Sequence, residues 1–113
     1  IYKGRIIVIY QPHLYSRTRD FADELAKALA LADKCMLVDI YPAREEAIPG
    51  ITSKLIVERA KAAGVGDFSY VGLKENAIRE AVSFAAKSDV IITMGAGSIT
   101  LIRHQILEEL DGV

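Results

Sequence analysis

The sequence contains few of the residues that build disulfide scaffolds or metal clusters. Its 113 residues include one cysteine, no tryptophan and three prolines. A single cysteine excludes an intrachain disulfide, which is compatible with a reducing cytoplasm, and no cysteine and histidine cluster has metal-binding spacing. Because Cys35 stands in the apolar stretch Cys35-Met-Leu-Val38, which we interpret as a buried strand, we expect an inert core thiol.

The sequence also lacks an excess of charge of either sign, long apolar runs and a phosphate-binding loop. A formal net charge of -1 gives no indication of a nucleic-acid or membrane-surface partner. No apolar run approaches the roughly 20 residues that span a bilayer, so we expect no membrane helix. Without a Gly-x-x-x-x-Gly-Lys-[Ser/Thr] motif, the chain alone is not expected to hold ATP in the manner of a P-loop protein.

The composition that remains is typical of one ordinary globular domain. Hydrophobic residues make up 51% of the chain and charged residues 26%. A length of 113 residues is enough for a single core and too short for two. Since the sequence begins at Ile1 rather than at methionine, we expect residues 1–113 to be a domain of a larger protein.

Short β-branched runs alternate with segments of helical periodicity. The predicted strands are Arg5–Tyr10, Lys34–Ile40, Phe68–Val71 and Asp89–Met94. The apolar residues predicted to form the buried faces of the four helices that follow are Phe21, Leu25, Ala28, Leu29 and Ala32 in the first, Ile56, Ala60 and Ala63 in the second, Ile78, Ala81, Val82 and Ala85 in the third, and Ile99, Ile102, Ile106 and Leu110 in the fourth. Thr52 or Ser53 is predicted to cap the second helix at its start, and Gly64 is placed to end it.

This order predicts an α/β fold, a three-layer Rossmann-like open sheet, mostly parallel, with helices on both faces. The strands are almost continuously apolar, as in Ile6–Ile9 and Val90–Ile92, which indicates that both of their faces are covered. Right-handed crossovers place the loops that follow the strands along one edge, where open α/β sheets bind ligands. The longest of these loops are expected at Gln11–Arg19 and Tyr41–Ile51.

The first of these loops concentrates side chains that suit an anionic ligand. It places His13, Tyr15, Arg17 and Arg19 between a strand and a helix. A helix N-terminus offers free amide donors and a partial positive charge, and arginine can hold a carboxylate with two parallel hydrogen bonds. The alternative is that Arg17 and Arg19 are solvated, one of them paired with Asp20 or Asp23. The pairs Glu45-Glu46 and Glu108-Glu109 are interpreted as solvated carboxylates.

A glycine turn follows the last predicted strand at the same edge. Gly95, Gly97 and Ser98 form this ligand-edge loop in the stretch Thr93-Met-Gly-Ala-Gly-Ser98. Two glycines allow a backbone to approach a bound group, but the stretch lacks the third glycine of a dinucleotide fingerprint. A tight strand-to-helix connection without a ligand is therefore the competing interpretation.

Three stretches give the chain a resemblance to a known family. Gln11-Pro-His-Leu-Tyr-Ser-Arg-Thr-Arg-Asp20 resembles the Gln-Pro-His-x-Tyr-[Ser/Thr]-Arg-Thr-Arg-Asp motif of UDP-N-acetylmuramate:L-alanine ligases, which belong to the Mur ligases. Asp39-Ile-Tyr-Pro-Ala-Arg-Glu-Glu-Ala-Ile-Pro-Gly50 is similar to the family's Asp-x-Tyr-x-Ala-x-Glu-x-x-Ile-x-Gly segment, and Gly95-Ala-Gly97 matches its glycine turn. The resemblance covers nearly the whole chain.

The resemblance implies the C-terminal domain of a three-domain, cytoplasmic enzyme of peptidoglycan synthesis. ATP, with Mg²⁺ held mainly by the central domain, activates the muramyl carboxylate as an acyl phosphate that the amine of L-alanine attacks. The C-terminal domain closes over the other two domains and receives the amino acid. The substrate-binding residues would be His13, Arg17, Tyr15 and Arg19, with Arg17 the partner of the alanine carboxylate; no residue here is assigned to the chemical step.

Two departures from the family pattern and two other functions bear on this expectation. Leu14 stands where many members carry arginine, and the family's Asp-Tyr-x-His-x-Pro linker does not occur in the sequence.

The alternatives are a non-catalytic anion-binding Rossmann-like module and a pure interaction domain. A Gly-Lys-Thr phosphate loop elsewhere in the parent protein would distinguish the ligase from the module.

Overall fold

The computed structural model describes residues 5–85 and 89–95. These residues form β1 (Ile6–Gln11), α1 (Tyr15–Leu29), β2 (Lys34–Val38), α2 (Lys54–Ala63), β3 (Phe68–Gly72), α3 (Lys74–Phe84) and β4 (Val90–Gly95). The predicted strands and the first three helices are confirmed in order and type. The helix predicted behind Ser98 lies outside the described residues.

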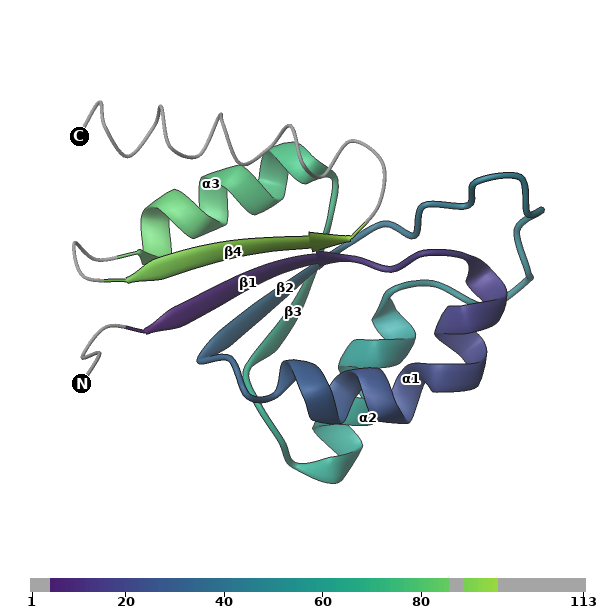
Figure 1. Cartoon of the computed structure of the whole chain (residues 1–113), viewed down its shortest axis with the longest axis horizontal. Coiled ribbons are helices and arrows are strands. Elements are labelled where there is room, and N and C mark those ends of the chain that lie inside the picture. Colours follow the sequence, from purple (N-terminus) through teal and green to yellow (C-terminus); the bar gives the residue numbers. More distant parts are fainter. Residues whose placement is uncertain (1–4, 86–88, 96–113) are drawn as a thin grey trace.

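The strands form a parallel sheet whose order reverses beside β1. The order is β3-β2-β1-β4, and every pairing within it is parallel. The chain moves outward from β1 to β3 and then crosses back to place β4 on the other side of β1 (Figure 1). Strands β1 and β4 therefore flank a topological switch point, which is where open α/β sheets bind their ligands.

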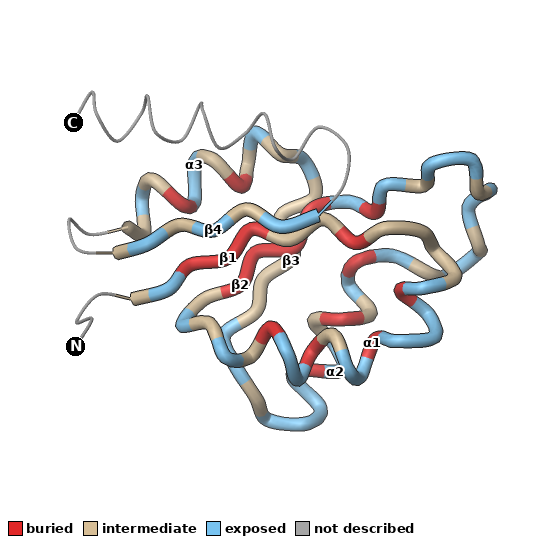
Figure 2. The backbone as a smooth tube through the Cα atoms, viewed as in Figure 1, coloured by how far each residue is buried: buried red, intermediate tan, exposed pale blue. Residues whose placement is uncertain are grey.

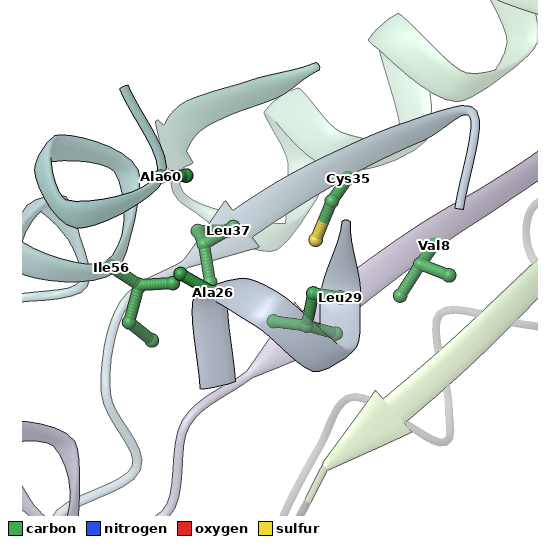
Figure 3. Packing of buried hydrophobic residues seen from close by; sticks show 7 residues of the cluster. All are labelled: Val8, Ala26, Leu29, Cys35, Leu37, Ile56 and Ala60. Atoms are coloured by element: carbon green, nitrogen blue, oxygen red, sulfur yellow. The ribbon is translucent and has the colours of Figure 1, made fainter. Parts of the chain in front are cut away.

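The two faces of the sheet are covered by different helices, as predicted for three layers. Helices α1 and α2 lie on one face and α3 lies on the other (Figure 1). Side chains of β1 and β2 alternate between two cores, since successive residues of a strand point to opposite faces. The core on the α3 side contains Ile7, Ile9, Met36, Val38, Ala77 and Ala81. The core under α1 and α2, drawn in Figure 3, contains Val8, Ala26, Leu29, Cys35, Leu37, Ile56 and Ala60.

Every strand is predicted to be covered on both faces, but the described residues leave one face of β4 without a helix. Alternate residues of this strand remain partly exposed, with Val90 at 40%, Ile92 at 40% and Met94 at 42% (Figure 2). The uncovered side chains share a face with those of β1 that α1 contacts. Helix α1 lies toward β2 and α2, so among the described residues no helix covers this side of β4.

The predicted buried face of α1 is also partly wrong. The buried residues of this helix are Thr18, Ala22, Ala26 and Leu29, whereas Phe21 is 53% exposed. The physical reason is a kink, because Phe21 has non-helical φ and ψ angles of -119° and 18°. Of the predicted stripe, Phe21 and Ala28 are exposed, whereas Leu29 lies in the core and Leu25 and Ala32 pack against it.

The start and end of α2 agree with the sequence signals. The Thr52 hydroxyl accepts a hydrogen bond from the amide of Lys54 at 3.2 Å, while Ser53 donates its hydroxyl to the carbonyl of Val38 at 2.5 Å. Ser53 is the N-cap residue, as one of the two predicted positions, but its side chain bonds to the end of β2 and makes no capping hydrogen bond. Gly64 takes the left-handed conformation that ends the helix, with φ of 69°. No helix in residues 5–85 and 89–95 is long and apolar enough to cross a membrane.

We expect the thiol of Cys35 to resist modification in the native chain. Cys35 is 1% exposed, and its burial raises the pKa of the thiol from 9.0 to about 12. The thiolate is the reactive form, so Ellman's reagent at pH 8 should not react with the folded chain and should titrate one thiol after denaturation in urea. Immediate reaction of the folded chain would contradict the buried placement. As pH rises, the thiol ionises in the unfolded chain before it ionises in the folded chain. The free energy of unfolding should therefore decrease between about pH 9 and about pH 12.

Candidate functional site

The segments that follow β1 and β2 pair with one another beyond the end of the sheet. The amide of Tyr41 donates to the carbonyl of Pro12 at 2.8 Å, and the amide of Leu14 donates to the carbonyl of Tyr41 at 2.9 Å. The rings of His13 and Tyr41 stack with centroids 6.0 Å apart. The β1–α1 loop (residues 12–14) and the β2–α2 loop (residues 39–53) therefore form one continuous ligand-edge structure.

Helix α1 begins earlier than the predicted loop Gln11–Arg19 allows. Its first residue is Tyr15, which places Arg17 and Arg19 within the helix. The first turn closes because both the amide and the hydroxyl of Thr18 donate to the carbonyl of Leu14, at 3.2 and 2.9 Å. The arginines consequently project in directions fixed by helical geometry.

A cleft opens between this helix and the end of β1. It has a volume of about 470 Å³ and is lined by Tyr10, Pro12, His13, Arg17, Thr18, Phe21 and Leu25. Arg17 is exposed and forms no ion pair with any described residue, so its five donors are available to a ligand. The lining of the cleft thus combines a cation and an imidazole with apolar side chains.

The structure brings together two of the four predicted substrate-binding side chains. His13 and Arg17 both line the cleft, whereas Tyr15 and Arg19 do not. Arg19 pairs with Asp20 at 2.9 Å, and this hydrogen bond raises the pKa of Arg19 and lowers that of Asp20. Residues 17 and 19 diverge by roughly 200° in a helix of 3.6 residues per turn. Asp23, the other partner considered for these arginines, pairs with Arg59.

The interpretation of Glu45 as a solvated carboxylate is wrong. Its two oxygens accept hydrogen bonds from the amide of Ser16 at 2.9 Å and from the Ser16 hydroxyl at 2.5 Å. The hydroxyl bond, followed by the amides of Ser16 and Tyr15, lowers the pKa of Glu45. The helix N-terminus predicted to offer free donors to a ligand therefore already holds a carboxylate of the protein. Glu46 is exposed, as predicted for both residues.

The glycine turn begins beside the first residue of the Gln-Pro-His motif. Gly95 ends β4 opposite Gln11 of β1, with φ of +131°. The Nε2 of Gln11 donates to the carbonyl of Asp39 at 3.3 Å, while its Oε1 is buried and accepts no hydrogen bond within the described part of the chain. Gly97 and Ser98, the other predicted residues of this turn, lie outside the described residues.

A second polar group lies at the same edge, on the ends of β2 and β3. The hydroxyl of Tyr70 donates to the carboxylate of Asp39, and this bond raises the pKa of Tyr70. The ammonium of Lys54 lies 5.1 Å from the centroid of the Tyr70 ring. No set of three or more histidine, cysteine, aspartate and glutamate side chains in residues 5–85 and 89–95 could hold a metal ion.

The cleft residues could be identified from the sequence only in part. His13 and Arg17 are evident from their place between a strand and a helix, whereas periodicity assigns Phe21 and Leu25 to the core, against which Leu25 does pack. Glu45 gave no local signal, since the side chain that it contacts is 29 residues away.

An open parallel sheet with a cleft beside its strand-order reversal is the architecture of a doubly wound α/β domain. Residues 1–97 match the family described as Mur ligase, glutamate ligase domain. The chain is 49% identical over 107 residues to a UDP-N-acetylmuramate–L-alanine ligase of Streptomyces coelicolor, covering 95% of this chain and 23% of that protein. A ligase of the same name from Cutibacterium acnes is 46% identical over 110 residues, covering 97% of this chain and 23% of the relative.

The chain therefore belongs to the Mur ligase family. It spans about a quarter of the length of these relatives, or 23%. The sequence resemblance and the expected open α/β fold are both confirmed.

Proposed function

We propose that residues 1–113 form the C-terminal domain of an ATP-dependent, ADP-forming ligase that joins L-alanine to UDP-N-acetylmuramate in cytoplasmic peptidoglycan synthesis. The names of the relatives support this activity, since both ligases compared above carry it. The observation that supports a direct role for this domain is the cleft where His13 and an unpaired Arg17 meet apolar side chains. A zwitterionic amino acid presents a carboxylate to such a cation.

In this proposal Arg17 binds the carboxylate of L-alanine through its planar guanidinium. Holding the amino acid by its carboxylate leaves the amine free to face the activated muramyl carboxylate, and fixing that orientation lowers the entropic part of the barrier. His13, held in place by stacking on Tyr41, forms the neighbouring wall of the cleft. Arg19 does not bind the alanine carboxylate in this proposal, because its guanidinium is paired with Asp20.

ATP and Mg²⁺ are assigned mainly to the parts of the ligase outside this chain. The sequence has no phosphate-binding loop, and the described residues offer no metal-ligand cluster. When bound there, ATP supplies the phosphoryl group that activates the muramyl carboxylate. The remaining partners of this domain are UDP-N-acetylmuramate and the N-terminal and central domains of the same polypeptide; neither nucleic acid nor membrane is proposed as a partner.

The full-length parent protein tests this function. We expect ADP release that requires UDP-N-acetylmuramate, L-alanine and ATP together, and no ADP release from the 113-residue chain alone. A phosphate loop in the parent sequence would agree with this result. A parent protein that binds a small anion but releases no ADP with the three substrates would instead support the non-catalytic anion-binding module.

A further inference from the structure

Helix α1 begins without a cap of its own. The residue at its N-cap position is Leu14, whose side chain has no oxygen to accept a hydrogen bond from the first turn. Leu14 also adopts a positive φ of 71°, a conformation that residues with a Cβ rarely take. The turn that carries Arg17 therefore depends on contacts from elsewhere in the chain.

Glu45 supplies the missing cap from the β2–α2 loop. Its carboxylate engages both the amide and the hydroxyl of Ser16, the residue directly before Arg17. A carboxylate at this position also opposes the partial positive charge of the helix N-terminus and faces the guanidinium of Arg19. One side chain thus performs the two tasks of an N-cap, satisfying a free amide and offsetting the helix dipole.

Backbone hydrogen bonds of the β2–α2 loop place the Glu45 carboxylate beside Ser16. The backbone of Tyr41 is paired with the β1–α1 loop, and the amide of Glu45 closes a turn onto the carbonyl of Pro42 at 2.8 Å. Within that turn Ala43 has a positive φ of 53°. Leu14 and Ala43 are the non-glycine residues with positive φ in residues 5–85 and 89–95, and they flank the same contact. Strained backbone of this kind persists where surrounding contacts hold it.

We propose that Glu45 is a positioning residue for amino-acid binding: by capping α1 through Ser16, it fixes the first helical turn and thereby the direction in which Arg17 enters the cleft. The inference rests on the proposed function, in which Arg17 holds the substrate carboxylate. It assigns to the β2–α2 loop a specific task at a site that its own side chains do not line.

The test compares Glu45→Ala and Glu45→Gln in the full-length ligase, with Glu46→Ala as the matched control. Glu46 is the next residue, is exposed, and makes no hydrogen bond or ion pair with described residues. Loss of a cap makes a helical turn fray, so Glu45→Ala should raise the KM for L-alanine about fivefold or more, with kcat and the KM for ATP changed less than about twofold. Glu46→Ala should leave all three within about twofold of the parent enzyme.

Two further readouts separate positioning from a general loss of stability. Hydrogen–deuterium exchange should be faster in the peptide that covers residues 14–20 of Glu45→Ala and unchanged in the peptides of α2 and α3. Glu45→Gln should recover part of the KM, because its amide oxygen still accepts a hydrogen bond from Ser16 while the charge is lost. Equal effects of both substitutions on exchange throughout the domain would overturn the proposal in favour of a structural role.

Arg17→Ala, measured in parallel, distinguishes failure of this inference from failure of the proposed function. If Arg17→Ala raises the KM for L-alanine and Glu45→Ala does not, Glu45 does not position the arginine. If Arg17→Ala leaves the dependence on L-alanine unchanged, the proposed function of the cleft fails, and the positioning role fails with it.

Discussion

Replacement of Arg17 by alanine in the full-length ligase is expected to reduce kcat/KM for L-alanine by roughly 30-fold or more. Removing one partner of a desolvated charge pair typically costs about 2–5 kcal/mol, and each 1.4 kcal/mol corresponds to a tenfold change. The affinities for ATP and for the UDP sugar should change little, because the interaction is made with the amino acid. Steady-state ADP release with each substrate varied in turn measures all three dependences.

The structure supplies a matched control for this substitution. Arg19 lies two residues further along α1, is also exposed and carries the same charge, but it is paired with Asp20 and does not line the cleft. Arg19→Ala should therefore alter kcat/KM for L-alanine by less than about threefold, in keeping with the small contribution of exposed ion pairs. Both variants lower the charge of the helix by one. The difference between their kcat/KM values for L-alanine therefore measures the specific contribution of Arg17.

Arg17→Lys should restore only part of the lost activity. An ammonium group keeps the charge but cannot form the two parallel hydrogen bonds that a planar guanidinium makes with a carboxylate. Complete recovery by lysine would indicate that charge alone is needed. If Arg17→Ala weakens ATP binding and leaves the dependence on alanine unchanged, Arg17 belongs to the nucleotide side of the cleft.

The sequence was sufficient to predict the order and type of the described helices and strands. Strands such as Ile6–Gln11 and Lys34–Val38 are apolar at successive positions because the core under α1 and α2 and the core under α3 take alternate residues. That pattern is a direct signature of a sheet buried on both faces. The predicted end of α2 was correct for a local reason too, since Gly64 adopts the left-handed conformation.

The misassigned residues depend on a local backbone kink in one case and on a contact between distant parts of the chain in the other. The position of Phe21 fits the helical period of the core residues. A kink in the backbone turns its side chain toward the cleft, and hydrophobic periodicity cannot predict such a kink. Glu45 resembles its exposed neighbour Glu46 in every local respect. Its role follows from the pairing of Tyr41 with Pro12 and Leu14, which places the carboxylate over a helix 29 residues away.

The same distinction applies to the two arginines. Their concentration between a strand and a helix correctly predicted that a cation faces the ligand edge. Which arginine does so depends on where the helix begins, and the positive φ of Leu14 sets that start at Tyr15. An error of a few residues in a helix boundary is usual, yet here it decides whether Arg17 and Arg19 share a loop or diverge.

Substitution of Gly95 by alanine is expected to lower the free energy of unfolding of the 113-residue chain by about 2–5 kcal/mol. A Cβ at this position would collide with the carbonyl oxygen of Gln11 and lie 2.9 Å from its Cβ and 3.1 Å from its amide nitrogen. Two of these atoms belong to the backbone of β1, the strand at the centre of the switch point, so they cannot move aside by a change of rotamer. Overpacking of this kind costs about 1–3 kcal/mol, to which the positive φ adds roughly 1–2 kcal/mol.

Gly50→Ala separates these two contributions. Gly50 also has a positive φ, +82°, but a Cβ there would meet nothing within 4 Å, so its substitution should cost only the conformational part. Urea denaturation followed by circular dichroism gives both free energies, and a difference of about 1–3 kcal/mol between the variants would measure the contact between β4 and β1. Equal losses would mean that β4 does not approach Gln11 as closely as the register requires. Since β1 leads directly into His13, a Gly95→Ala ligase that still folds should also bind L-alanine less tightly, because any displacement of Gln11 is transmitted to the cleft.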